Sequence, residues 1–210
     1  MKQKLNRISH LILLFFFILI AATEARANLY SSVKKYKDKG ISQEDIKKLS
    51  HYDHLIRYFS DYSYFSPEHK VSPDFIRALI LAESGANPQA VSNKNALGLG
   101  QILLTTGKEA AVKLAQSPIQ FRYVSKDRLQ NLCETDLFDP AVNILITCYL
   151  VAKYIYKFDG KLELVLSAWN AGENTESLSR GRHAPYRETE NLIGKVNAYF
   201  LYLQKNQTFP

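Results

Sequence analysis

The sequence predicts an all-α fold, with one mainly helical domain. Turn and cap signals divide the chain after residue 27 into helical pieces, and apolar residues recur at helical spacing within them. No stretch shows the alternation of a strand bounded by hairpin turns. With 210 residues, 46% of them hydrophobic and 22% charged, the chain is long enough to bury a sizeable core. Disorder of the whole chain is therefore excluded.

The first 27 residues have the layout of a secretory signal peptide. Basic residues precede an apolar run from Leu11 to Ala22 that is too short to span a membrane comfortably, and Ala25-Arg26-Ala27 resembles a signal peptidase site. We expect residues 1–27 to be removed, with an uncleaved N-terminal anchor as the alternative. In both cases the domain is expected to work outside the cytoplasm, in the periplasm or cell envelope or as a secreted protein. After removal of the signal we expect no stable membrane insertion.

The charge of the mature chain is mildly positive. The formal net charge is +7, and it falls to +4 when four basic residues and one acidic residue leave with the signal peptide. A modest positive field favours anionic polymers, which for an exported protein means cell-wall glycans or membrane surfaces. No lysine and arginine cluster is interleaved with aromatic residues, so we expect no nucleic-acid partner. We expect a monomer.

The main domain is placed at residues 70–210, and residues 28–69 are expected to form an N-terminal helical elaboration. The start of the first helix of the main domain is indicated by Ser72-Pro73-Asp74. These residues offer a hydroxyl N-cap, a proline at the first helical position and an acid in the first turn. This helix is predicted to end at Ser84, because Gly85 suits a helix end.

Further helices are predicted after a loop at residues 86–100. Thr106 and Glu109 have the spacing of a capping box for a helix that ends near Ala115, and residues 116–137 read as irregular. The remaining helices are a long one from Asp139-Pro140 through Lys157, a shorter one from Lys161 to Asn170, and a last one with Leu192, Val196, Tyr199, Phe200 and Leu203 inward.

Glu83 is the first candidate for chemistry. Ile76, Leu79 and Ile80 form an apolar helical stripe, and the next member of that stripe is Glu83. A carboxylate without a partner is costly to bury, so its pKa rises and it stays protonated near neutrality, as a general acid must. The alternative is a structural carboxylate that an arginine or backbone donors satisfy.

Several short motifs in fixed order resemble the goose-type lysozyme-like lytic transglycosylases. Each motif alone is weak, but together they span residues 70–203 of one helical domain. The motifs are Glu83-Ser84 followed by Pro88, Ala90 and Ser92; Gly98-Leu99-Gly100-Gln101-Ile102; Phe138-Asp139-Pro140 with Asn143-Ile144; Ala168-Trp169-Asn170-Ala171-Gly172; and Pro185-Tyr186-Arg187-Glu188-Thr189.

The resemblance implies a lysozyme-like fold, no cofactor, no metal, and cleavage of the β-1,4 bond between N-acetylmuramic acid and N-acetylglucosamine with a 1,6-anhydro product. It implies that Glu83 is the acid/base. Glycines 98 and 100 would let the backbone approach a ligand, although an ordinary tight turn is the alternative. The residues expected to bind the glycan are Ser84, Gly98, Leu99, Gly100, Gln101, Trp169, Asn170 and Tyr186.

The distribution of acids favours transglycosylation. A hydrolase of this kind needs a second carboxylate, whereas attack by the substrate's own hydroxyl does not, and no Asp or Glu occurs between Glu83 and Glu109. Three positions depart from the family pattern. Gly100 replaces a methionine, Trp169 replaces a tyrosine and either forms a sugar-stacking wall or fills the core, and Leu192 replaces a tyrosine whose hydroxyl lies near the acid.

Two alternatives to the transglycosylase therefore stay open, namely a lysozyme-type hydrolase and a non-catalytic peptidoglycan-binding scaffold of an envelope-spanning assembly. A role beside a secretion, conjugation or pilus machinery is suggested by analogy. His51 and His54 lack a third ligand at suitable spacing, so no metal site is expected. Cys133 and Cys148 either pair in an oxidising compartment, or Cys148 is a small buried residue on a helical stripe.

Overall fold

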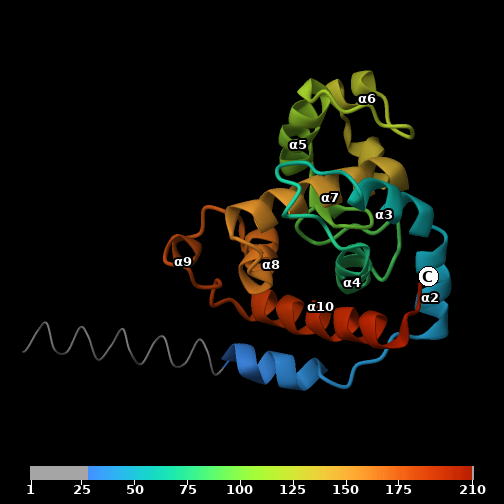
Figure 1. Cartoon of the computed structure of the whole chain (residues 1–210). Coiled ribbons are helices and arrows are strands. Elements are labelled where there is room, and N and C mark those ends of the chain that lie inside the picture. Colours follow the sequence, from blue (N-terminus) through green and yellow to red (C-terminus); the bar gives the residue numbers. More distant parts are fainter. Residues whose placement is uncertain (1–27, 210) are drawn as a thin grey trace, which may run out of the picture.

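The computed structural model describes residues 28–209 and shows a mainly helical domain, which confirms the predicted fold class (Figure 1). The predicted signal peptide lies outside the described residues. Within residues 28–209, no helix combines the length and the apolar character that crossing a bilayer requires. After helical residues 28–36, the α-helices are α2 (Gln43–Ser50), α3 (Asp53–Ser60), α4 (Pro73–Ser84), α5 (Leu104–Gln116), α6 (Lys126–Gln130), α7 (Pro140–Lys157), α8 (Leu162–Ala171), α9 (Glu176–Ser179) and α10 (Arg187–Asn206).

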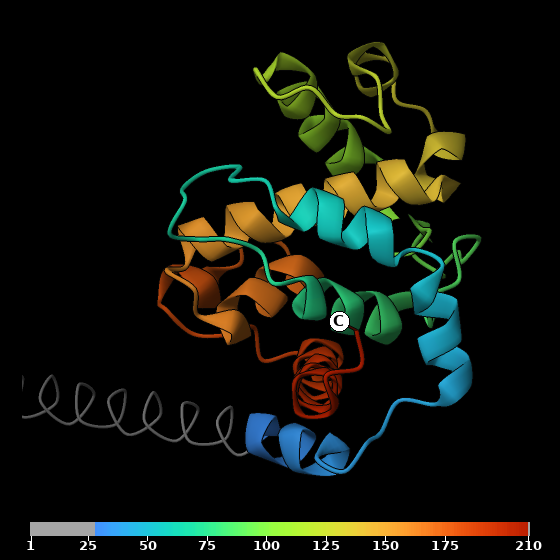
Figure 2. The ribbon, with the colours of Figure 1, turned by 45° about the vertical axis from the view of Figure 1, so that its right-hand side comes forward.

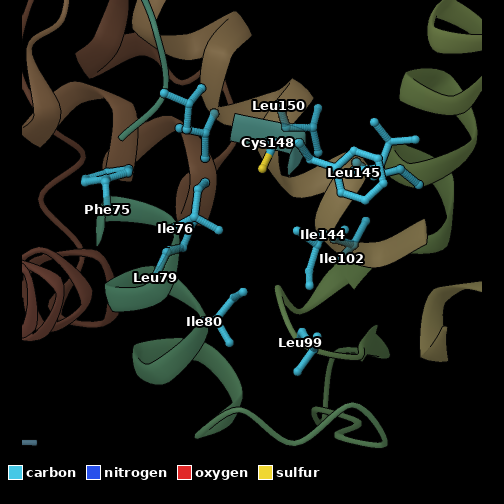
Figure 3. Packing of buried hydrophobic residues seen from close by; sticks show 14 of the residues in the cluster. Phe75, Ile76, Leu79, Ile80, Leu99, Ile102, Ile144, Leu145, Cys148 and Leu150 are labelled. Atoms are coloured by element: carbon cyan, nitrogen blue, oxygen red, sulfur yellow. The ribbon is translucent and has the colours of Figure 1, made fainter. Parts of the chain in front are cut away.

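Helix α7 runs through the middle of the domain, as its sequence predicts. The Asp139 side chain caps it by accepting from the backbone N–H groups of Ala141 and Val142, and Pro140 occupies the first turn. Figure 3 shows α4 facing α7 across the core. Ile76 and Leu79 of α4 and Ile144 of α7 are fully buried there. Burial of such side chains is the main stabilising contribution to a domain of this size.

Helix α10 closes the other side of α4. Figure 2 looks nearly along α10, which lies between α4 and helical residues 28–36. The contact with residues 28–36 is close, because a Cβ added to Gly194 would lie 2.7 Å from the carbonyl oxygen of Ser32. Helix α3 also adds the fully buried Ile56 and Phe59 to the common core. The N-terminal segment thus packs on the same core as the rest of the domain.

A short hairpin stands where the sequence predicted only a loop. Strands β1 (Ala96–Leu97) and β2 (Ile102–Leu103) pair antiparallel, with Ala96 opposite Leu103 and Leu97 opposite Ile102. Two-residue strands are too short to show an alternating pattern, so periodicity could not reveal them. Asn143 of α7 holds the hairpin. Its Nδ2 donates to the carbonyl oxygen of Leu97, and its Oδ1 accepts from the N–H of Gly100.

Two local predictions between the hairpin and α7 were wrong. Helix α5 begins at Leu104 without a side-chain cap, so Thr106 and Glu109 lie inside it and form no capping box. The segment predicted to be irregular contains α6, capped by the Ser125 hydroxyl, and a 3₁₀-helix, Glu134–Phe138. Arg128 ties this segment to the start of α7, because it donates to both Asp136 and Asp139.

The two cysteines are not paired. Cys148 is fully buried on α7 with its Sγ 3.7 Å from the Ser60 hydroxyl, whereas Cys133 is exposed and its thiol donates to Asp136. Burial raises the pKa of the Cys148 thiol to about 12, which keeps it protonated and unreactive. The alternative of a disulfide is therefore wrong, and the alternative of a small buried residue on a helical stripe is confirmed.

Candidate active site

Glu83 lies in the last turn of α4, on the stripe that the sequence predicted. Ile76, Leu79 and Ile80 before it are fully buried, and the helix ends directly after Ser84 because Gly85 adopts a left-handed conformation, with φ 60°. The carboxyl group therefore lies at the C-terminal end of a helix that has no basic residue in its last turn. The helix dipole at that end disfavours a negative charge.

The pKa of the Glu83 carboxyl group lies near neutral pH. Burial raises its pKa to about 7, against the lowering effects of a hydrogen bond from Trp169 and of the Lys195 charge, while the Glu188 charge raises the pKa further. At this pKa both the acid and its conjugate base are populated near neutrality. A single group can then donate a proton and accept one later in the same reaction.

Trp169 orients this acid. Its indole Nε1–H donates a hydrogen bond to Oε1 of Glu83 at 2.8 Å, from the last turn of α8. The sequence offered two roles for this ring, a sugar-stacking wall and a core filler, and the observed contact adds a third. Leu192, which stands where the related motif often has a tyrosine hydroxyl, is buried. The indole N–H therefore supplies a donor to the acid in a site that lacks that hydroxyl.

Ser84 fastens the hairpin to α4. Its hydroxyl donates to the carbonyl oxygens of Ile80 and Leu99, at 3.1 and 2.8 Å. Both acceptors are backbone groups, so the hydroxyl fixes the turn beside Glu83 and does not bond the carboxyl group itself.

Gly98, Leu99 and Gly100 are turned toward α7. All three are buried, and the Leu99 side chain is fully enclosed. A Cβ on Gly98 would lie 2.2 Å from the carbonyl oxygen of Leu137, and one on Gly100 would lie 2.3 Å from the Thr147 hydroxyl. The contact of these three residues with glycan stays a prediction. The glycines permit a close approach of the hairpin turn to Leu137 and to α7.

Gly98→Ala should destabilise the domain by about 3 kcal/mol, because it adds left-handed strain to an overlap with Leu137 and Asn143. Gly160→Ala is a matched control. Gly160 has the same φ of 70°, but nothing lies within 4 Å of its added Cβ, so a loss of only about 1 kcal/mol is expected. Urea unfolding of both variants measures the difference. Equal losses would show that the close approach to α7 contributes nothing.

The polar residues expected to bind glycan have different surroundings. The side-chain amide of Gln101 donates to the carbonyl oxygens of Ala90 and Gly98, which fixes its orientation. Asn170 accepts a hydrogen bond from the Thr189 hydroxyl at 2.6 Å through Oδ1, and this leaves its N–H groups for another acceptor. Tyr186 is 53% exposed at the start of α10. Asn170 follows Trp169 directly on α8.

The sequence did not reveal that two charged residues of α10 lie near Glu83. Glu188 and Lys195 shift its pKa in opposite directions, and they lie two turns apart on one face of α10. Glu188 also bonds Lys94 at 2.6 Å, which joins α10 to the turn before the hairpin. The spacing of seven residues was readable from the sequence. Which helix faces the acid was not, because that depends on tertiary packing.

The helical fold, the glutamic acid with a pKa of about 7 and the hairpin held by Ser84 and Asn143 are together typical of a lysozyme-like domain. Residues 65–191 match the family model described as "Transglycosylase SLT domain". The chain belongs to this family.

Relatives agree with this assignment. The "Putative soluble lytic murein transglycosylase" of Haemophilus influenzae is 32% identical over 146 residues, which cover 64% of this chain and 22% of that protein. An inactive variant of lytic transglycosylase Slt from Pseudomonas aeruginosa has the same fold, with TM-score 0.54, 22% identity and coverage of 77% of this chain and 25% of that one. The 70 kDa soluble lytic transglycosylase of Escherichia coli also has this fold, with TM-score 0.54 and 23% identity, and the match covers 74% of this chain and 24% of that one. The chain thus spans about a quarter of the length of these relatives.

Proposed function

We propose that this domain is a peptidoglycan lytic transglycosylase in which Glu83 is the general acid and base. The observation that carries the proposal is the state of that carboxyl group, because burial raises its pKa to about 7 and the Trp169 indole holds it in place. A structural carboxylate would be expected to meet an arginine or several donors. Within residues 28–209, the Glu83 carboxyl group instead accepts a single hydrogen bond, from the Trp169 indole.

The reaction needs two proton transfers at the same carboxyl group. Protonated Glu83 gives its proton to the glycosidic oxygen as the bond from that oxygen to the muramoyl anomeric carbon breaks. The resulting carboxylate then takes the proton of the muramoyl 6-hydroxyl, whose oxygen bonds to the anomeric carbon. The products are a 1,6-anhydro end and a free N-acetylglucosamine 4-hydroxyl. Asn170 and Gln101 offer uncharged amides to the sugars, which add no charge beside the acid.

Lysozyme-type hydrolysis is the second candidate, and Glu188 is the observation that favours it. This carboxylate lies close enough to raise the pKa of Glu83, and hydrolysis by inversion needs a second carboxylate that activates water. Glu188 is ion-paired with Lys94, however, so its carboxylate is already engaged on the α10 surface. We therefore favour intramolecular attack.

Purified peptidoglycan digested with the protein should yield fragments with 1,6-anhydromuramoyl ends. Mass spectrometry separates the two reactions, because an anhydro end lacks the one water that hydrolysis adds. Fragments with reducing ends alone would overturn the transglycosylase in favour of hydrolysis. A parallel digest with Glu188→Gln should keep the anhydro product, since intramolecular attack does not use that carboxylate.

We further propose that the protein acts on the wall outside the cytoplasm, where its substrate lies, after export with residues 1–27 as signal peptide. The division into residues 28–69 and 70–210, the monomeric state and a role beside a secretion, conjugation or pilus machinery remain predictions.

A further inference from the structure

His183 and Glu190 form a buried polar pair that the proposed reaction does not use. His183 lies in the loop before α10 and Glu190 in the first turn of α10, and the two residues are only 7% and 5% exposed. The Nε2 atom of His183 lies 3.5 Å from Oε1 of Glu190. Within the described part of the chain, neither atom has another polar partner in hydrogen-bond geometry. Buried polar atoms are rarely left unpartnered, so one proton between these two atoms is the arrangement that satisfies both.

Two hydrogen bonds to α8 lie on either side of this pair. Directly after the histidine, the backbone N–H of Ala184 donates to the fully buried Ser167 hydroxyl at 2.7 Å. Directly before the glutamate, the fully buried Thr189 hydroxyl donates to Oδ1 of Asn170 at 2.6 Å. The pair and the two hydrogen bonds therefore close a ring that runs from α8 through the loop to α10 and back to α8.

This ring brackets the part of α8 that contacts the acid. Ser167 and Asn170 are its two anchor points on α8, and Trp169 lies between them in the sequence. The indole of Trp169 donates to Glu83, and the charge of Lys195 on α10 also acts on that carboxyl group. A displacement of α10 against α8 would move both groups relative to the acid. The position of the two helices therefore determines the surroundings of Glu83.

We propose that His183 and Glu190 are positioning residues, which hold α10 against α8 and thereby keep the Trp169 donor aligned with Glu83. The inference rests on the proposed function, because the alignment serves catalysis only if Glu83 transfers protons. A buried ionisable pair adds little stability compared with apolar side chains of similar volume. A hydrogen bond fixes a direction, however, which apolar packing does not. The geometry that the pair imposes therefore explains it better than stability does.

The test separates stability from activity. His183→Leu leaves the Glu190 carboxyl group buried without its partner, so the urea midpoint of unfolding should fall by about 1 M. Its kcat on purified sacculi should fall about tenfold, because the acid is misaligned. The double variant His183→Leu/Glu190→Leu removes both polar groups, so its midpoint should return to within about 0.3 M of the unmodified protein. Its kcat should stay about tenfold lower, because two leucines restore the packing without the direction.

Glu190→Gln is the conservative variant, because its amide can still donate to His183 Nε2, and it should keep kcat within about threefold. His69→Leu is the matched control. Its Nε2 atom also lies 3.5 Å from a carboxylate oxygen, that of Asp159 in the turn after α7. The control should keep kcat within about twofold. Recovery of kcat together with stability in the double leucine variant would overturn the positioning role, as would an equal loss of kcat in His69→Leu.

A second measurement does not need catalysis. The hydrogen bond from Trp169 and the charge of Lys195 both lower the pKa of Glu83, and together they outweigh the raising charge of Glu188. Carbon NMR titration of the Glu83 carboxyl group should therefore show a pKa above about 7 in the double leucine variant. An unchanged pKa would overturn the positioning role. Failure of the unmodified protein to cut sacculi, with the pKa raised as expected, would instead overturn the proposed function.

Discussion

Glu83→Gln should lower peptidoglycan cleavage about a thousandfold, because general acid–base catalysis contributes about 10² to 10⁴ in rate and no second group can replace both proton transfers. Glutamine keeps the shape of the side chain and an oxygen that can accept the Trp169 hydrogen bond. It removes only the titratable proton. Release of soluble anhydromuropeptides from purified sacculi measures the loss.

Glu134→Gln is the matched control, since Glu134 is exposed in the 3₁₀-helix before α7. It should retain full activity. Glu83→Gln should still bind sacculi in a pull-down, because the substitution keeps the shape of the side chain and changes no other residue. If the unmodified protein and Glu83→Gln bind equally and neither cuts, the non-catalytic scaffold is the better description. Unchanged turnover in Glu83→Gln would refute the catalytic assignment directly.

Trp169→Phe should lower kcat about tenfold, because it removes the donor that orients the acid while keeping an aromatic ring. It should also change the pH profile. The Trp169 hydrogen bond lowers the pKa of Glu83 by stabilising the charged form, so its loss raises that pKa above its value of about 7. Activity that requires the protonated acid falls as pH rises through this pKa. The alkaline limb of kcat/KM should therefore move to higher pH.

Tyr36→Phe is the control for Trp169→Phe, because it also removes one hydrogen-bond donor, the one to Asn191 on α10, and keeps its ring. Its pH profile should match that of the unmodified protein. A purely structural role for Trp169 would lower activity at every pH and leave the limb in place. That outcome would contradict its part in tuning the acid.

The parts that the sequence predicted well depend on local physics. Pro140 with the Asp139 cap, Pro73 and Gly85 determine helix ends through their own backbone preferences, and the stripe before Glu83 depends on spacing within one helix. These features are encoded within a few residues. They survive folding because tertiary packing agrees with them.

The parts that could not be predicted depend on contacts between distant residues. Trp169 lies 86 positions from Glu83, and no local pattern assigns an indole N–H to that acid. The glycine-rich motif was predicted to let the backbone approach a ligand, and the structure shows that it also approaches Asn143 and Thr147 of α7. The same two glycines fit both environments, since glycine permits a close approach to any neighbour.

Trp169 is also the only tryptophan in the chain, so the tryptophan fluorescence of the protein comes from this one position. Light absorbed at the red edge of the protein spectrum excites this one indole, and its emission depends on the electric field and the water around it. The protein thus carries a fluorophore, built from its own sequence, in direct contact with the carboxyl group of Glu83. Stopped-flow emission should follow the binding of a glycan strand beside Glu83 and its departure, without a label and on the time scale of a single turnover.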